Sequence, residues 1–168
     1  MNVIAFDLSL TATGFAFTRG GGRSNGVMNG GKLRGAERLS VLTGRYLDIL
    51  TAFPWDLILI ESGVVRSNAA FALGELHGCF KMELFERGLT PTLIAPASVK
   101  KYATGKGNAG KPEMLTAAIR RLDYQGHDDN EVDALWMLAM GMDYLGEPLA
   151  PVPVAQRAAL AGVQWEKA

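Results

Sequence analysis

The sequence has few of the residues from which small proteins build disulfide frameworks or zinc sites. Among its 168 residues there is one cysteine, Cys79, and there are two histidines, His77 and His127. A single cysteine excludes an intramolecular disulfide framework and any zinc site made of several cysteines. The histidines are too isolated in sequence to suggest zinc ligands. We expect Cys79 to be a small core residue in a reducing compartment.

The sequence also lacks an excess of charge and a long hydrophobic run. Seventeen Lys and Arg residues balance seventeen Asp and Glu residues, so DNA binding would have to come from local clustering. No apolar run approaches the roughly 18 residues that a membrane-spanning helix needs. The chain opens on a strand-like run and not on a basic leader with an apolar segment. We expect no membrane association and a cytoplasmic location.

The composition that is present, 48% hydrophobic and 20% charged, is typical of a globular protein. A chain of this length is most simply one domain, since about 150 residues bury roughly two-thirds of the surface of the unfolded chain. We assign residues 1–146 to that domain. Residues 147–168 contain three prolines between Pro148 and Pro153 and are expected to form a weakly ordered C-terminal tail.

Hydrophobic patterning predicts an α/β fold. Residues 2–8 are apolar on both faces, which indicates a central strand covered on both sides. Short strands at 15–18 and near 27–28 would form a meander with it, and helices then alternate with strands. This order favours a mixed central sheet of about five strands flanked by helices. The remaining strands are expected at 57–60 and 92–95, and the helices at 36–53, 69–87, 96–102, 111–122 and 129–145.

The helix at 69–87 carries apolar or small residues around most of its circumference, with Gly74 and Gly78 four residues apart. A helix that packs on a sheet needs only one apolar stripe. The pattern therefore indicates either a second covered face, as at a homodimer seam, or a deeply buried helix.

Three acids stand in apolar surroundings. Asp7 and Glu61 each end a strand-like run, and Asp133 lies within an apolar helical pattern. A buried carboxylate is costly without a partner charge or a metal, so three converging acids suit a divalent cation. The alternatives are that Asp7 forms a turn, that Glu61 reaches solvent and that Asp133 lies on a polar helix face.

Residues beside these acids extend the candidate site. Asn130 lies three residues before Asp133 and hence on the same side of its helix. Asp128 with Glu131 resembles a capping box, which makes Asp128 or Asp129 a helix cap. His127 is close enough to Asn130 to line the site. The Ser9, Thr11, Thr13 and Gly14 turn after Asp7 is expected to let a phosphate backbone approach.

Positive charge gathers in only one glycine-rich segment. Lys100, Lys101, Lys106 and Lys111 are interleaved with glycines, and Arg120 and Arg121 could extend the cluster along a helix. Lysines and exposed loop N–H groups suit phosphate contacts, although a solvated surface loop is the simpler interpretation.

Four segments together resemble the RuvC family of Holliday junction resolvases, most closely its compact phage and prophage members. They are Phe6-Asp-Leu-Ser-Leu-Thr-Ala-Thr-Gly14, Ile60-Glu61, Val99-Lys-Lys-Tyr-Ala-Thr-Gly-Lys-Gly-Asn-Ala-Gly-Lys111 and Asn130-Glu-Val-Asp-Ala-Leu135. The likeness covers residues 1–146 in the same order. It implies an RNase H-like fold and a homodimeric endonuclease that cuts two strands of a four-way junction symmetrically.

The resemblance also implies roles for individual residues. Asp7, Glu61 and Asp133 would bind two Mg²⁺ or Mn²⁺ ions, and Asn130 occupies a ligand position that is acidic or histidine in other members. Asp129 could substitute for it. Lys100 and Lys111 match basic residues that contact DNA near the scissile phosphate, with Lys101 and Lys106 beside them. Where some members place wedge aromatics after Glu61, this chain has Val64, Val65 and Arg66, and Arg66 is a further DNA-binding candidate.

Two other functions fit parts of the pattern. The substitution at Asn130 would suit a branched-DNA binder that no longer cuts. The hydroxyl-rich turn after Asp7 could instead hold Mg-ATP, as in actin-like or sugar-kinase-like phosphotransferases, but such enzymes need a second domain for which this chain is too short.

Overall fold

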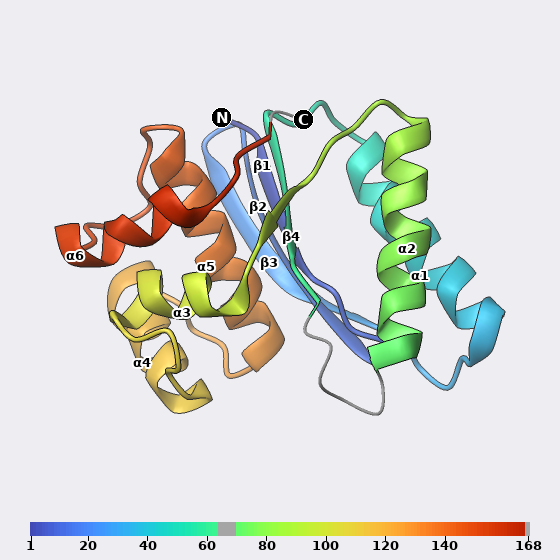
Figure 1. The fold of residues 1–168 in the computed structure, drawn as a ribbon, viewed down its shortest axis with the longest axis horizontal. Coiled ribbons are helices and arrows are strands. Elements are labelled where there is room, and N and C mark those ends of the chain that lie inside the picture. The colour runs from blue at the N-terminus through green and yellow to red at the C-terminus, as the bar shows by residue number, and fades with distance from the viewer. Residues whose placement is uncertain (64–69, 167–168) are drawn as a thin grey trace.

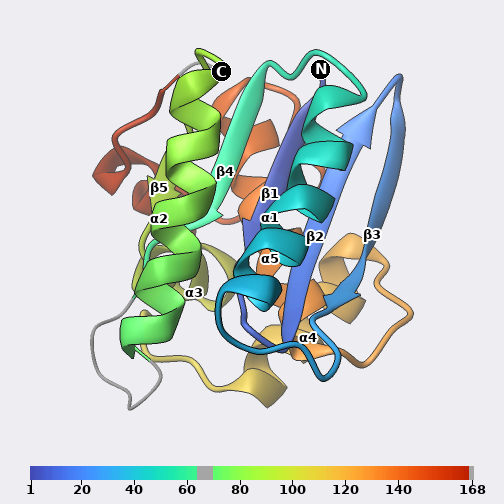
Figure 2. The same cartoon turned by 90° about the vertical axis from the view of Figure 1, so that its right-hand side faces the viewer.

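The computed structural model describes residues 1–63 and 70–166, which form a mixed five-stranded sheet between two helical layers (Figures 1 and 2). The strand order is β3-β2-β1-β4-β5. β1 pairs antiparallel with β2 and parallel with β4. This confirms the predicted α/β class and the central place of the first strand. The strands are β1 (Val3–Asp7), β2 (Ala12–Arg19), β3 (Gly22–Asn29), β4 (Leu57–Glu61) and β5 (Thr92–Ile94).

The two faces of the sheet carry different helices, as Figure 1 shows. Helices α1 and α2 cover one face, and α3, α4 and α5 with the C-terminal segment cover the other. Within the described ranges, no helix is long and apolar enough to cross a membrane. The helices are α1 (Gly35–Thr51), α2 (Ala70–Glu86), α3 (Pro96–Thr104), α4 (Lys111–Leu122), α5 (Asp129–Tyr144), α6 (Val154–Arg157) and the 3-10 helix η1 (Ala158–Gly162).

Strand β1 supplies both hydrophobic cores. Val3 and Ala5 belong to the cluster under α3, α4 and α5, whereas Ile4 and Phe6 belong to the cluster under α1 and α2. All four side chains are fully buried. Because side chains alternate across a strand, a strand buried on both sides is apolar throughout, and each fully buried large side chain contributes about 1.5–3 kcal/mol.

Helix α5 lies unusually close to the sheet at Gly141. A Cβ atom at this position would stand 2.7 Å from Leu59 Cδ1 and 3.1 Å from Val3 Cγ1. The missing side chain therefore lets the helix backbone approach β1 and β4. This packing fixes the helix whose first turns carry Asp133.

The strands β2 and β3 are longer than their sequence predicts. Each has eight residues, and they pair from Arg19 and Gly22 out to Ala12 and Asn29. Gly20 and Gly21 take positive φ angles of 55° and 82° at the tip. Glycines with positive φ allow a tight hairpin, and the pairing then extends through Gly, Ser and Asn residues that have little intrinsic strand preference.

The expectation of a weakly ordered C-terminal tail is wrong. Arg157 of α6 binds the buried carboxylate of Asp143 through Nε at 2.9 Å and Nη2 at 2.7 Å, and the Tyr102 hydroxyl donates to the same carboxylate at 3.0 Å. Further on, the Trp165 ring stacks on Tyr144 at 4.1 Å. These partners lie 14 or more residues away, so local composition could not reveal them.

The prediction that Cys79 is a small core residue is also wrong. It is partly exposed and lines a groove of about 550 Å³ between α1 and α2, beside Thr43 and Met82. Helical spacing put it on an apolar helix, but most of that helix surface faces away from the sheet. Cys79 is therefore not a core residue.

Candidate metal centre and nucleic-acid interface

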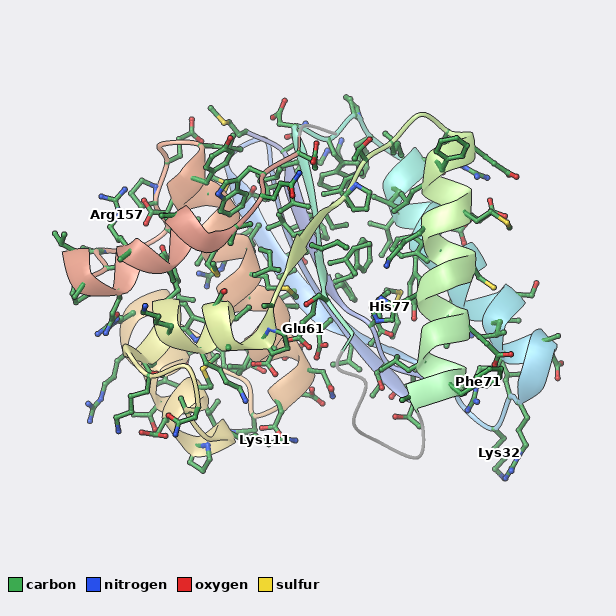
Figure 3. The ribbon with its side chains drawn as sticks, viewed as in Figure 1. Lys32, Glu61, Phe71, His77, Lys111 and Arg157 are labelled. Carbon is green, nitrogen blue, oxygen red and sulfur yellow. The ribbon has the colours of Figure 1, made fainter. Side chains whose placement is uncertain are left out.

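The three candidate acids come together at one end of the sheet. Asp7 ends β1 and Glu61 ends β4, and these are neighbouring parallel strands in which Phe6 pairs with Ile60. Parallel neighbours bring their carboxyl ends to the same edge, where α/β proteins bind ligands. Asp133 reaches this edge from the second turn of α5. In Figure 3, Glu61 lies where the sheet meets the helical layer that carries Lys111.

Gly14 allows α5 to reach this edge. Gly14 pairs with Asp7 across β1 and β2, and a Cβ atom on it would lie 1.9 Å from the backbone oxygen of Asn130. The start of α5 therefore packs directly on the strand beside Asp7. The expected phosphate approach at this glycine is wrong, because the backbone of α5 occupies that side.

The electrostatics show that the acids share one partly dehydrated environment. Burial raises the pKa values of both Asp7 and Glu61, and the negative charge of Asp133 raises them further. Burial raises the pKa of Asp133 as well, while Lys100 and Lys111 lower it. The negative charge of Asp7 also raises the pKa of Glu61. Neighbouring carboxyl groups of this kind disfavour being charged together unless a cation neutralises them.

Within residues 1–63 and 70–166, no three Asp, Glu, His or Cys side chains form a preformed metal cage. The donor set nevertheless suits Mg²⁺, which prefers carboxylate oxygens and keeps several waters.

The residues at the start of α5 have separate tasks. Asp128 is the helix cap, and its Oδ1 accepts hydrogen bonds from the backbone N–H groups of Asn130 at 2.9 Å and Glu131 at 3.4 Å. Asp128, and not Asp129, is therefore the helix cap. Asn130 Nδ2 also donates to Asp128 Oδ1 at 3.1 Å, and among the described residues its side-chain oxygen accepts no hydrogen bond. The side chain of Glu131 binds the Tyr124 hydroxyl, and His127 is exposed.

Two lysines border the site next to Asp133. A small hollow of about 80 Å³ is lined by Lys100, Lys111, Asp129 and Asp133, with Met114 and Val132 below them. Lys111 Nζ bonds Asp129 Oδ2 at 2.7 Å, and this bond raises the pKa of Lys111. The hollow thus places two cationic groups beside the Asp133 carboxylate.

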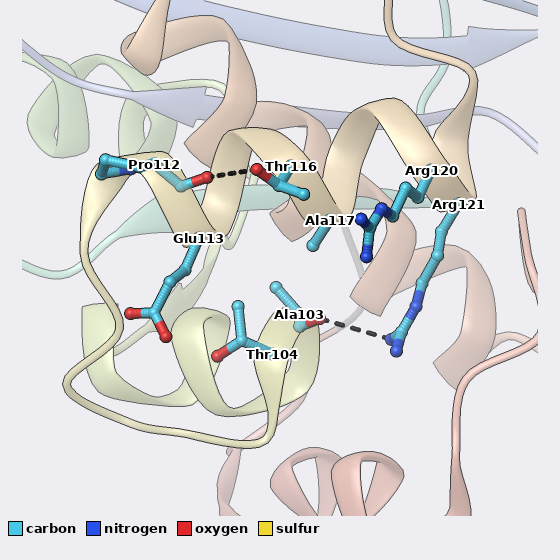
Figure 4. A pocket seen from close by; sticks show the side chains of 8 residues that line it. All are labelled: Ala103, Thr104, Pro112, Glu113, Thr116, Ala117, Arg120 and Arg121. Carbon is cyan, nitrogen blue, oxygen red and sulfur yellow. Dashed lines mark hydrogen bonds between the residues drawn. The ribbon is translucent and has the colours of Figure 1, made fainter.

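The other predicted basic residues lie around the same helical layer. Lys101 is exposed on α3, and Lys106 Nζ pairs with Glu113 Oε1 at 2.9 Å. A second hollow of about 400 Å³ opens between α3 and α4, with Arg120 and Arg121 along one side (Figure 4). Arg121 is held by Ala103 O at 3.3 Å and by Gln156 Oε1 at 2.6 Å. Arg66, with Val64 and Val65, lies outside the described residues.

Comparison with known proteins decides the family. Crossover junction endodeoxyribonuclease RuvC of Anaeromyxobacter dehalogenans is 32% identical over 137 residues, which cover 78% of this chain and 70% of that protein. RuvC of Corynebacterium glutamicum is 30% identical over 154 residues, covering 84% of this chain and 68% of that protein. The chain belongs to the RuvC family. No protein-family model matches it.

Solved RuvC structures agree with the fold. The structure of Thermus thermophilus RuvC covers 91% of this chain with a TM-score of 0.68 and 23% identity. The structure of T. thermophilus RuvC in complex with a Holliday junction substrate gives a TM-score of 0.69 and 22% identity. The predicted RNase H-like fold is confirmed by this likeness.

In this RuvC chain two residues of the hydroxyl-rich turn, Thr13 and Gly14, are inaccessible to an ATP phosphate. The Thr13 side chain is fully buried, and Gly14 faces the backbone of α5. Thr13 instead bonds the hydroxyl of Tyr46. Sequence reasoning missed Tyr46, because a tyrosine at a core position of a helix looks the same as a purely apolar core residue.

Proposed function

We propose that this RuvC-family chain is a structure-selective, metal-dependent endonuclease that resolves four-way DNA junctions. It would cut two strands symmetrically and leave 5′-phosphate and 3′-hydroxyl ends, in recombination, repair or phage DNA processing. The observation that carries the proposal is the carboxylate cluster at the sheet edge beside a hollow with two lysines. Relatives named crossover junction endodeoxyribonuclease, and a RuvC bound to a Holliday junction substrate, support the same activity.

The proposed metal ligands are Asp7, Glu61 and Asp133, with the carbonyl oxygen of Asn130 in the fourth position. Two Mg²⁺ ions would bind, and Mn²⁺ could substitute. When bound, the cations lower the pKa of water and neutralise charge on the phosphate. The partly buried carboxylates repel one another, and a cation relieves that repulsion. Asp129 is the less suitable ligand because Lys111 already pairs with it.

The lysines are proposed to hold the DNA. Lys100 and Lys111 border the carboxylates, so they would contact the scissile phosphate, and Lys111 would exchange Asp129 for a phosphate oxygen. Lys101 and Lys106 lie further out and would contact flanking phosphates, as would Arg66. A protein without net positive charge can bind DNA in this way, with an affinity that falls steeply as salt rises.

A cleavage assay tests the function. Labelled four-way junction and linear duplex are incubated with Mg²⁺, Mn²⁺ or a chelator, and we expect symmetric nicks in the junction only, with either metal. Cleavage should disappear in Glu61→Gln. Lys111→Ala should slow cleavage roughly 100-fold, because charge stabilisation near the phosphate is lost. As a comparison, Lys101→Ala should mainly weaken DNA binding. It should also reduce the slope of log affinity against log salt concentration by about one.

Other outcomes of this assay favour the alternatives. Junction binding without nicks in either metal would leave the non-catalytic DNA binder. Turnover of ATP without DNA cleavage would revive the phosphotransferase.

The fourth ligand has its own prediction. Asn130→Asp should lower the Mg²⁺ concentration for half-maximal cleavage about three- to tenfold, because a charged ligand strengthens a weak carboxylate site. Asn130→Ala should raise it. The measurement is a Mg²⁺ titration of the cleavage rate. If Asn130→Ala has no effect while Asp129→Ala raises the midpoint, Asp129 is the ligand instead.

We also propose that the chain is a homodimer that joins through α2. The large side chains Phe71, Met82 and Phe85 are 80%, 53% and 83% exposed, and their spacing of 11 and 14 residues places them on one helix face. An exposed apolar stripe of this kind marks a protein contact. A two-fold arrangement would give two active sites, as symmetric cutting requires.

Sedimentation tests the dimer. The wild-type protein should sediment at about twice 18.0 kDa. Phe85→Asp should give a monomer with its fold intact, whereas Ile119→Asp, at an exposed apolar residue of α4, should stay dimeric. A wild-type monomer at micromolar concentration that still cuts both strands together would contradict the proposal.

A further inference from the structure

Thr13 is the centre of a buried hydrogen-bond network behind the Asp7 strand. Its Oγ1 accepts the backbone N–H of Ser9 at 2.9 Å, donates to the backbone oxygen of Ser9 at 2.9 Å and lies 2.6 Å from the Tyr46 hydroxyl. Thr13 and Tyr46 are both fully buried. One side chain therefore binds both backbone groups of the residue that follows Asp7 by two positions.

The direction of each bond follows from counting hydrogens. The Thr13 hydroxyl has one hydrogen, and this hydrogen is committed to the Ser9 carbonyl. Tyr46 must then donate to Thr13 Oγ1. All the bonding capacity of the threonine hydroxyl is used. Removing it would leave the buried Tyr46 hydroxyl and the two partly buried backbone groups of Ser9 without this partner.

Tyr46 connects this network to the helical layer of α1 and α2. Its ring packs against Phe6 at 5.6 Å and against Phe80 of α2 at 5.1 Å between centroids. Phe6 immediately precedes Asp7. The Tyr46 side chain that binds Thr13 is thus packed against Phe6, the last residue of β1 before Asp7.

Thr13 and Gly14 face opposite layers. Successive residues of a strand point to opposite faces, so Thr13 meets α1 while Gly14 meets the backbone of Asn130 in α5. Asp7 and Gly14 are paired across β1 and β2. The segment that joins them therefore contacts both helical layers.

We propose that Thr13 and Tyr46 are positioning residues that fix the connection after Asp7, so that its carboxylate is held against Glu61 and Asp133 for cation binding. The inference rests on the proposed function of these acids as metal ligands. Residues that orient ligands in this way typically change metal affinity or activity 10- to 100-fold when they are replaced.

The matched variants are Thr13→Val, which keeps the side-chain shape without the hydroxyl, and Thr13→Ser, which keeps the hydroxyl. Thr13→Val should lower the cleavage rate at saturating junction roughly 10- to 100-fold and should raise the Mg²⁺ midpoint. Junction affinity in Ca²⁺ should change less than about twofold, because the DNA-contacting lysines are untouched. Thr13→Ser should restore both quantities, and Tyr46→Phe should show a smaller shift in the same direction.

Two readouts do not depend on cleavage. Hydrogen exchange at the Ser9 amide should accelerate in Thr13→Val and in Tyr46→Phe but not in Thr13→Ser. The Mg²⁺-induced rise in melting temperature should be smaller than in the wild type for Thr13→Val and Tyr46→Phe, and unchanged for Thr13→Ser. If Thr13→Val does not fold, the comparison of Tyr46→Phe with wild type carries the test.

A wild-type rate and Mg²⁺ midpoint in Tyr46→Phe and Thr13→Val, despite faster Ser9 exchange, would overturn the proposal. A Mg²⁺-induced stabilisation that is equal in all variants would do the same. If instead the wild type binds Mg²⁺ but cuts no junction, the proposed function fails, while the melting and exchange measurements still decide the role of Thr13.

Discussion

An Asp7→Asn protein without metal should be more stable than the wild type at pH 8, although it should cut no junctions. Burial and the charge of Asp133 raise the pKa of Asp7 to about 7 in the folded protein, from 3.8. A raised folded pKa means that the stabilising contribution of the protonated form is complete below about pH 4 and is lost as the pH rises through the folded pKa. At pH 8 the wild type buries an ionised Asp7 carboxylate, which destabilises the fold, whereas the Asp7→Asn variant buries a neutral amide.

Thermal melting in a chelator measures this effect. We expect a gain of about 1–3 kcal/mol for Asp7→Asn at pH 8, at about 2–4 °C for each kcal/mol, and a much smaller gain at pH 5. Mg²⁺ should raise the melting temperature of the wild type and reduce the difference, since a ligand stabilises only the state that binds it. Asp48→Asn, at an exposed acid of α1, should change little. A lower melting temperature for Asp7→Asn than for the wild type at pH 8 would contradict the expectation that burying the charged Asp7 side chain destabilises the metal-free protein.

Gly14→Ala should have the largest effect on the fold at the site. The new Cβ would stand 1.9 Å from the Asn130 oxygen and 2.3 Å from its carbonyl carbon, and both are backbone atoms that cannot rotate away. Helix α5 would have to move off β2 and carry Asp133 away from Asp7. We expect a loss of about 3 kcal/mol or more, at the upper end for overpacked sites, together with loss of cleavage.

The comparison for Gly14→Ala is Gly22→Ala. Gly22 is also a strand glycine, but its Cβ would meet only Arg19 O at an ordinary 3.5 Å. Melting and cleavage should stay close to wild type in that variant. If Gly14→Ala melts normally and cuts junctions, the contact between β2 and α5 does not assemble the site as we describe.

Much of the fold could be predicted because its signals are local. Residues 2–8 are apolar on both faces, and this is what a strand between two helical layers requires. Asp7 and Glu61 end such strands, and the parallel pairing of β1 with β4 then brings them to one edge. Their positions in the sequence and the alternation of helices and strands were enough to predict that they meet.

The parts that could not be predicted depend on partners far apart in the chain. Asp143 looks like an ordinary helix acid, and only the fold shows that Arg157 and Tyr102 bind it. The same holds for Tyr46 and Thr13, which are 33 residues apart. At the start of α5 the cap motif was visible, but the pairing of Asp129 with Lys111, 18 residues away, was not.

The alternation of Val3 and Ala5 with Ile4 and Phe6 divides the molecule into two halves that share one sheet. The proposed chemistry lies almost entirely on the side of α3, α4 and α5, and the exposed apolar stripe of α2 lies on the other. Substitutions in the two cores are separated by the sheet and should combine additively. Evolution could therefore change how copies of such a chain associate without disturbing how they cut, except where Thr13 and Tyr46 connect the two halves.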